Sequence, residues 1–239
     1  MNDIRRKCLD ELLKERRIIK RNYKKENYHR EVKEYKKENI KSVYVLNEKL
    51  YNNIKNKGFD LIYANEIYDD KVILKLDRVI NEHNNYERHL LVGELGSVNK
   101  YNNIDTDFSL NVVNSYTVAL LNNLGVKRIT LSYEMDDEQI KLLIDSYKNR
   151  YKKNPNLSII VYAKEEMMIS KFDLLSYYNI TSGYLKDKFN NLYSLISNNN
   201  LMYIYNYKAR NLKDINKYYR MGINEVRYNI IDEEDLKNI

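Results

Sequence analysis

Residues 115–133 read SYTVALLNNLGVKRITLSY, and this stretch decides the fold class. Its first ten residues place apolar side chains at the three- and four-residue spacings of an amphipathic helix. Gly125 then ends the helix, because glycine enters the left-handed conformation at a helix end without steric cost. A run rich in apolar and β-branched residues follows at 128–133 and predicts a buried strand. The stretch is therefore one helix–strand unit of an α/β protein.

The same order of helix, glycine and strand occurs at two further places. Gly58 follows a predicted helix at 48–57, and Gly222 follows one at 212–221. The sequence contains eight strand candidates, at 42–46, 60–64, 71–76, 89–94, 108–112, 128–133, 157–163 and 225–230. Strands that alternate with helices favour a parallel sheet, and eight of them in about 200 residues favour a (β/α)8 TIM-like barrel.

Short loops join the second strand to the third and the fourth to the fifth, so we expect an incomplete or irregular barrel. An open doubly wound sheet is the structural alternative. We place a basic helical arm at 1–41, the barrel domain at 42–239 and an insertion at about 172–200. Such an insertion follows the carboxyl end of a barrel strand, which is the functional face of this fold.

The formal net charge of +7, from 41 Lys and Arg against 34 Asp and Glu, lies wholly in the arm. Residues 1–41 contain 15 basic and 8 acidic side chains, and the 26 basic and 26 acidic side chains that follow cancel. A locally basic segment attracts an anionic partner, so we expect the arm to contact RNA. The plainer alternative is an amphipathic helix at 3–19 that covers the barrel beside a solvated basic flank.

The remaining composition excludes several classes of protein. A hydrophobic content of 43% is enough for a folded core. No apolar run approaches the roughly 20 residues of a membrane span and no signal-peptide core is visible, so we expect a cytoplasmic protein without a membrane partner. The single cysteine, Cys8, excludes an internal disulfide, and its place on the apolar stripe of the arm predicts burial. The three histidines lack metal-ligand spacing, so we predict no metal site.

Several motifs resemble the collagenase-like peptidase family, unassigned-peptidase family thirty-two, in its C-terminal module. The strongest are LNVVNSY at 110–116 and LGVKRITLSYE at 124–134, followed by VYAK at 161–164, MISK at 168–171 and YLKDK at 184–188. In that family a strand that ends in Asn-x-x-Asn-Ser leads through a helix to Leu-Gly-Val and a Ser-x-Glu strand end. The similarity spans nearly the whole chain.

This resemblance implies a barrel-like fold and one of several activities. Members are named as peptidases, yet several hydroxylate bases of transfer or ribosomal RNA or act in oxygen-independent quinone biosynthesis, with an iron–sulfur cluster held by four cysteines. Here Asp173 stands in the place of the first cluster cysteine, and no cysteine follows Cys8. A lone carboxylate is a poor substitute for thiolates. We therefore expect a degenerate member without a cofactor, which either has lost the activity or works beside a homologous cysteine-containing subunit.

Polar groups at the carboxyl ends of the barrel strands converge on one face. The predicted catalytic residues there are Glu134, Asn111 and Lys164. Glu134 and Asn111 lead, because a polar group within or at the end of an apolar strand costs energy unless something satisfies it. The predicted substrate-binding residues are Asn114, Tyr133, Glu94, Lys171, Lys186 and Lys188. The alternative is a set of solvated loop residues and helix caps, and Asn114 in particular can cap the helix that follows it.

The insertion interleaves aromatic residues with lysines: Tyr177, Tyr178 and Tyr184 precede Lys186 and Lys188. This pattern is typical of proteins that bind single-stranded nucleic acid, although chance explains it as well in a chain with 24 tyrosines. We predict a substrate-binding or accessory module in RNA base hydroxylation. The alternatives are a peptidase or other hydrolase of the same family and a structural subunit without an active site of its own.

Overall fold

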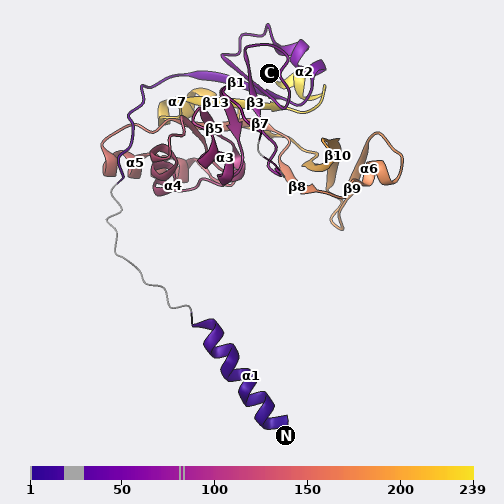
Figure 1. Cartoon of the computed structure of the whole chain (residues 1–239). Coiled ribbons are helices and arrows are strands. Elements are labelled where there is room, and N and C mark those ends of the chain that lie inside the picture. The colour runs from indigo at the N-terminus through magenta and orange to yellow at the C-terminus, as the bar shows by residue number, and fades with distance from the viewer. Residues whose placement is uncertain (1, 19–29, 81, 83) are drawn as a thin grey trace.

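A closed barrel of eight parallel strands forms the body of the protein. The computed structural model describes residues 2–18, 30–80, 82 and 84–239 (Figure 1). Strand β13 pairs with both β1 and β7, and β6 pairs with β7, so the sheet has no free edge within the ring. The prediction of a (β/α)8 barrel is confirmed. The barrel strands are β1 (Ile40–Val45), β2 (Leu61–Ala64), β3 (Val72–Lys75), β4 (Leu90–Val92), β5 (Ile104–Thr106), β6 (Arg128–Thr130), β7 (Leu157–Ala163) and β13 (Glu225–Ile230).

The outer layer of helices is incomplete, as expected. Its helices are α2 (Glu48–Ile54), α3 (Leu95–Lys100), α4 (Ser115–Asn123), α5 (Asp137–Tyr151) and α7 (Ile215–Met221), with short 3₁₀ turns η1 (Phe108–Leu110) and η2 (Asp235–Asn238). A loop without a described helix joins β2 to β3, as predicted, and another joins β3 to β4. The predicted short loop between the fourth and fifth strands was wrong, because α3 lies there. The predicted glycine stops are present: Gly125 has φ 95° and Gly222, which ends α7, has φ 108°. Only glycine adopts this backbone without strain.

The fifth strand was predicted at the wrong place. Strand β5 lies at Ile104–Thr106, whereas residues 108–110 of the predicted strand form η1 and Val112 makes only an isolated bridge to Leu131. The Asp107 side chain accepts from the amide of Phe108 and so starts the 3₁₀ turn. Because the charged residue Asp105 lies at the centre of β5, the strand does not form an apolar run and its sequence does not predict a buried strand.

The insertion is a four-stranded antiparallel sheet that is longer than predicted. Its elements are β8 (Glu166–Ser170), α6 (Leu174–Tyr177), β9 (Gly183–Lys186), β10 (Leu192–Asn198) and β11 (Leu201–Asn206), in the order β8-β11-β10-β9. The short strand β12 (Arg210–Asn211) then returns antiparallel to β7. The insertion therefore spans 166–206 instead of 172–200, and it projects from one side of the barrel (Figure 1).

Strand β11 covers the carboxyl end of the barrel. Its side chains Leu201, Tyr203 and Tyr205 are buried in one cluster with Tyr44 and Tyr63, which come from β1 and β2. The Tyr203 hydroxyl donates to Asp77, which follows β3, over 3.2 Å. The insertion therefore closes the mouth of the barrel.

The arm is helical only in its first part. Helix α1 (Asn2–Arg17) stands apart from the barrel in Figure 1, and its described side chains are exposed. Cys8 is exposed too, so the prediction that it is buried was wrong. Ile19, His29 and His83 lie outside the described residues.

Residues 30–39 run along the barrel without helical structure and belong to it. Val32 is buried in the main core, and the amide of Lys33 donates to Asn122 over 2.7 Å. The side chain of Asn224 donates to the carbonyl of Lys36 over 2.9 Å. The predicted boundary at residue 41 is wrong, because this segment and the first two residues of β1 contribute to the core and to the sheet.

Two truncations test this boundary. Removal of residues 1–18 should shift the melting temperature by no more than about 2 °C, because exposed side chains contribute little to stability. Removal of residues 1–41 should abolish cooperative unfolding, because it deletes Val32 and the start of β1. Circular dichroism during heating measures both, and equal melting temperatures for the two truncated chains would contradict the assignment.

Candidate functional site

A cavity of about 440 Å³ opens at the carboxyl end of the barrel, beside the insertion. The loops after β5 and β6 and the start of β8 form its walls. Its lining residues are Phe108, Ser109, Asn111, Ser132, Tyr133, Glu134, Glu165, Glu166 and Met167. The structure thus brings together three of the predicted site residues, Asn111, Tyr133 and Glu134, as convergence at the strand ends requires.

One wall of the cavity is aromatic. The rings of Phe108 and Tyr133 lie 4.5 Å apart at an interplanar angle of 49°. The Tyr133 carbonyl accepts from Arg210, and its hydroxyl accepts from the Asn229 side chain over 3.3 Å. Burial raises the pKa of the Tyr133 phenol well above 10, so the hydroxyl keeps its proton at neutral pH.

Three carboxylates also line the cavity, and two of them face arginines. Glu166, whose side chain is 5% exposed, lies 2.9 Å from Arg78, and Glu165 lies 3.6 Å from Arg210. Burial raises the pKa of Glu166, against the opposing effect of nearby cations. The exposed Glu134 has no ion pair or side-chain hydrogen bond to another described residue. Its carboxylate is therefore the group in the cavity that is available to a ligand.

Asn111 presents the second available group. It ends η1 in the left-handed conformation, with φ 49° and ψ 52°, which asparagine tolerates better than most residues. Its backbone amide donates to the Phe108 carbonyl over 2.9 Å, which holds the loop. The side-chain amide makes no hydrogen bond to the described residues in this structure.

Lys164 lies outside this cavity. Its buried ammonium group pairs with Asp232 and lies 3.6 Å from both Glu234 and Asp235. Burial alone would lower the pKa of Lys164, but these carboxylates raise it. The contacts tie the C-terminal segment to the end of β7, so the structure gives Lys164 a structural position.

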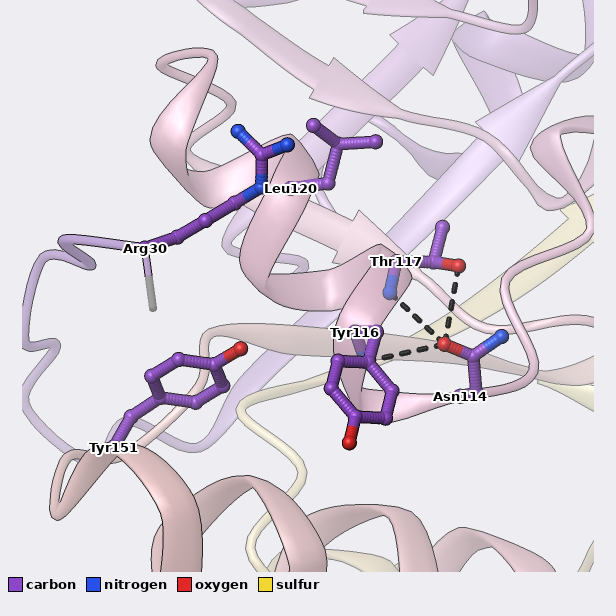
Figure 2. A pocket seen from close by; sticks show the side chains of 6 residues that line it. All are labelled: Arg30, Asn114, Tyr116, Thr117, Leu120 and Tyr151. Carbon is purple, nitrogen blue, oxygen red and sulfur yellow. Dashed lines mark hydrogen bonds between the residues drawn. The ribbon is translucent and has the colours of Figure 1, made fainter. Parts of the chain in front are cut away.

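Asn114 and Glu94 are helix caps. The side-chain oxygen of Asn114, Oδ1, accepts from the backbone amides of Tyr116 and Thr117 over 3.1 and 2.9 Å at the start of α4 (Figure 2). Glu94 accepts from the amides of Gly96 and Ser97 at the start of α3. These are the roles that the alternative interpretation assigned to such residues.

The cavity drawn in Figure 2 is a separate feature of the outer layer. It measures about 630 Å³ and lies between α4, the end of α5 and the start of the segment at 30–39. Arg30, Tyr116 and Tyr151 line it, and Asn114 is at its edge. It shares no residue with the lining of the cavity at the carboxyl end.

The insertion separates its aromatic and basic residues into two groups. Tyr184 pairs in register with Ser194, which pairs with Tyr205, so Tyr184 lies on the sheet face that covers the barrel. Helix α6 packs through Leu175 on the opposite face and carries Tyr177 and Tyr178, beside Phe172 and Lys171. Tyr177 and Tyr178 are therefore separated from Lys186, whereas Tyr184 shares a face of β9 with that lysine, so the predicted interleaving occurs only in part.

Exposed aromatic and basic side chains form a strip on β9, in the turn that follows it and directly after β11. We call it the insertion strip and define it by Tyr184, Lys186, Lys188, Phe189 and Tyr207. The rings of Tyr184 and Tyr207 lie 5.5 Å apart, and the Lys188 ammonium lies 4.9 Å from the Phe189 ring. The backbone beside Tyr207 adjoins the cavity, because the amide of Asn206 donates to the carbonyl of Glu165, a lining residue, over 2.8 Å. The Tyr207 ring itself lies 5.8 Å from the Lys164 ammonium.

The interior of the barrel holds a buried ion network that the sequence analysis missed. Arg128 lies 3.1 Å from Glu225 and 3.2 Å from Asp105. Arg227 pairs with Asp107, whose other oxygen lies 3.2 Å from Lys75. The alternation Glu-Val-Arg-Tyr-Asn at 225–229 could have revealed it, since polar residues at every second position of a barrel strand share one face.

This network leaves little room for a ligand on the barrel axis. Its three cations and three carboxylates balance in charge, and the space between Lys75, Tyr44 and the tyrosines of β11 is only about 10 Å³. That volume is at or below what one water molecule needs. A cavity of about 230 Å³ beside Asn65, Lys75 and Asp77 also opens at this end, and the lateral cavity of about 440 Å³ with Asn111 and Glu134 offers more room for a substrate.

The residues present do not suit the iron–sulfur cluster that the family resemblance implies. Cys8 is the one cysteine of the chain and lies on α1. Asp173, in the place of the first cluster cysteine, caps α6 and accepts from the hydroxyls of Ser176 and Ser197, which lowers its pKa. Among the residues that the structure describes, no group of three or more His, Cys, Asp and Glu side chains is placed to hold a metal ion.

Removal of one charged side chain from the ion network should lower the free energy of unfolding. Asp107→Asn leaves the buried Arg227 without its carboxylate, and we expect a loss of about 3–5 kcal/mol in the free energy of unfolding. Urea denaturation measures the loss. Asp145→Asn, at an exposed position on α5, should change the free energy by less than about 0.5 kcal/mol. A change at Asp107 as small as at Asp145 would show that the network contributes nothing.

The Asp107 carboxylate should also make the free energy of unfolding depend on pH in the acidic range. Burial raises the pKa of Asp107, but Arg227 and Lys75 outweigh it and lower the pKa from 3.8 to about 2. A lowered pKa stabilises the folded state above the unfolded-state pKa, and this contribution is lost as the pH falls through the folded-state pKa. Between pH 4 and 2 the wild type should lose roughly 2 kcal/mol more than Asp107→Asn, as pH-dependent denaturation would measure. Parallel curves for the two proteins would contradict this assignment.

Comparisons with known proteins leave the family open. A search with models of known protein families found no match, and searches of curated proteins and of solved structures found none either. In the described part of the chain, no helix has both the length and the apolar character that crossing a membrane requires.

Proposed function

We propose that this protein is a single-stranded RNA-binding module that presents RNA to a modifying partner, as a cluster-less relative of the collagenase-like peptidase family. One observation carries the proposal: exposed aromatic and basic side chains lie together on the insertion, and the residue before Tyr207 is hydrogen-bonded to Glu165, which lines a cavity at the carboxyl end of the barrel. The motif resemblance supplies the context of RNA base modification.

The insertion strip has the chemistry of a stacking surface for nucleic acid. Tyr184, Phe189 and Tyr207 are 61%, 70% and 43% exposed, although large aromatic side chains are usually buried. Each exposed ring offers a face to an unpaired base, and base stacking on such rings contributes about 1–3 kcal/mol per base. The strip accepts different sequences, because every base has an aromatic face.

The charge around the strip suits a phosphate backbone. Lys186 and Lys188 are exposed, and Lys208 follows Tyr207 directly. The nearby Asp187 accepts from the side-chain amide of Asn191 and from the backbone amides of Asn191 and Phe189, which lowers its pKa. Three lysines against one carboxylate leave the strip locally positive, although the barrel domain is neutral as a whole. Helix α1, with its exposed basic residues, supplies a second contact for RNA.

The catalytic groups of the modification reside on a partner in this proposal. A four-cysteine cluster requires thiolates, and this chain has one cysteine. The ion network and β11 occupy the barrel axis, where barrel enzymes assemble their reacting groups. A homologous subunit with the cysteines would act on RNA that this chain holds.

The proposal is tested by the affinity for a short unstructured RNA. In a fluorescence anisotropy titration, the double variant Tyr184→Ala/Tyr207→Ala should bind at least about tenfold more weakly than the wild type, because two stacking faces are lost. Affinity for the wild type should fall steeply as salt rises, since phosphate contacts release counterions. The control is Tyr116→Ala on α4, where a tyrosine of similar exposure, 49%, lies far from the strip along the chain.

Two results would contradict the proposed function. The first is a wild-type protein that retains no RNA at low salt. The second is full affinity in the double variant, which would place any RNA contact elsewhere on the chain. Cleavage of peptides by the purified protein, lost in Glu134→Gln, would instead support the hydrolase alternative.

A further inference from the structure

We infer that the cavity at the carboxyl end accepts one unpaired guanine base of the RNA that lies on the insertion strip. The inference rests on the proposed function and names the part of the substrate that the cavity recognises. It follows from the position of the cavity, its walls and the two polar groups that remain available in it.

The position of the cavity suits the base that follows one stacked on Tyr207. The amide of Asn206 donates to the carbonyl of Glu165, and Glu165 lines the cavity. The Tyr207 ring lies 5.8 Å from the ammonium of Lys164, which precedes Glu165, so the cavity is one residue along the chain from the place where a strand stacked on Tyr184 and Tyr207 would end. Bases leave a single strand at little cost, because no pairing partner has to be displaced.

The walls of the cavity suit a planar aromatic ligand. Its volume of about 440 Å³ lies within the roughly 300–1,000 Å³ of small-molecule sites. Phe108 and Tyr133 both line it, and their rings lie 4.5 Å apart, so this part of the wall is aromatic. The thioether of Met167, an exposed side chain at the start of β8, borders the same space.

The charge of the cavity selects a base and excludes a phosphate. Of its three carboxylates, Glu165 and Glu166 are balanced by Arg210 and Arg78, which leaves the charge of Glu134 in excess. A phosphate would be repelled from this space, whereas the N–H groups of a base would be attracted to it. The backbone therefore stays outside, near the lysines of the insertion strip.

The available groups identify the base. A carboxylate only accepts hydrogen bonds, and its two oxygens match two adjacent donors. Guanine is the one standard RNA base whose Watson–Crick edge carries two adjacent donors, N1–H and the 2-amino group. The side-chain amide of Asn111 lines the same cavity and can donate to the neighbouring O6. Glu134 and Asn111 together thus complement the guanine edge.

The test compares two RNAs that differ by one amino group. One oligonucleotide contains a single guanosine among uridines and adenosines, and the other has inosine, which lacks the 2-amino group, at that place. The wild type should bind the guanosine RNA about tenfold more tightly, which corresponds to the loss of one recognition hydrogen bond. Glu134→Gln should bind both RNAs equally. The control Glu138→Gln, at an exposed position on α5, should keep the tenfold preference.

The outcomes separate this inference from the proposed function. Equal binding of the two RNAs by the wild type would overturn the guanine assignment and leave the RNA-binding function intact. A preference that persists in Glu134→Gln would overturn the role of that carboxylate. The variant Tyr184→Ala/Tyr207→Ala should bind both RNAs more weakly with the preference retained, because the strip and the cavity contribute separately. Failure of the wild type to bind either RNA would overturn the function and the inference together.

Discussion

The ion network inside the barrel is the constraint on which the rest of the structure depends. Arg128 bridges Glu225 and Asp105, and Arg227 pairs with Asp107, so strands β5, β6 and β13 are joined across the interior. A buried charge without a partner would cost several kcal/mol, which leaves these strands few other arrangements. The network therefore ties barrel closure to specific pairs, while apolar packing of the outer helices supplies the bulk of the core.

Because β11 covers the barrel axis, the candidate site lies beside the axis instead of on it. Strand β11 places Tyr203 and Tyr205 over the network, and the remaining space there is too small for a substrate. The opening lies to the side, where Asn111 and Glu134 share a cavity with the start of the insertion. The same insertion that covers the mouth thus provides both a wall of the cavity and the exposed strip beside it. The proposed binding surface therefore depends on the packing of the insertion against the barrel.

Much of the fold could be predicted from local pattern, and the failures have physical causes. Seven of the eight barrel strands coincide with predicted runs, because their outward faces are apolar. Strand β5 was missed since Asp105 interrupts its pattern, and that charge is tolerated because Arg128 pairs with it and the Tyr63 hydroxyl donates to it. The predicted site residues likewise include some whose position follows from the strand ends and one whose position depends on distant partners. Asn111, Tyr133 and Glu134 meet because parallel strand ends must converge, whereas Lys164 has carboxylate partners from the distant C-terminal segment.

The sequence by itself determined the alternation of helix and strand, the glycine stops, the caps and the concentration of charge in the first 41 residues. These are local properties, since each depends on a few neighbouring residues and on backbone preference. Only the tertiary structure decided which charged residues pair inside the barrel, which face of the insertion covers it and which aromatic rings stay exposed. Those outcomes depend on side chains far apart in the chain, such as Arg227 and Asp107, whose burial is favourable only once both are in place.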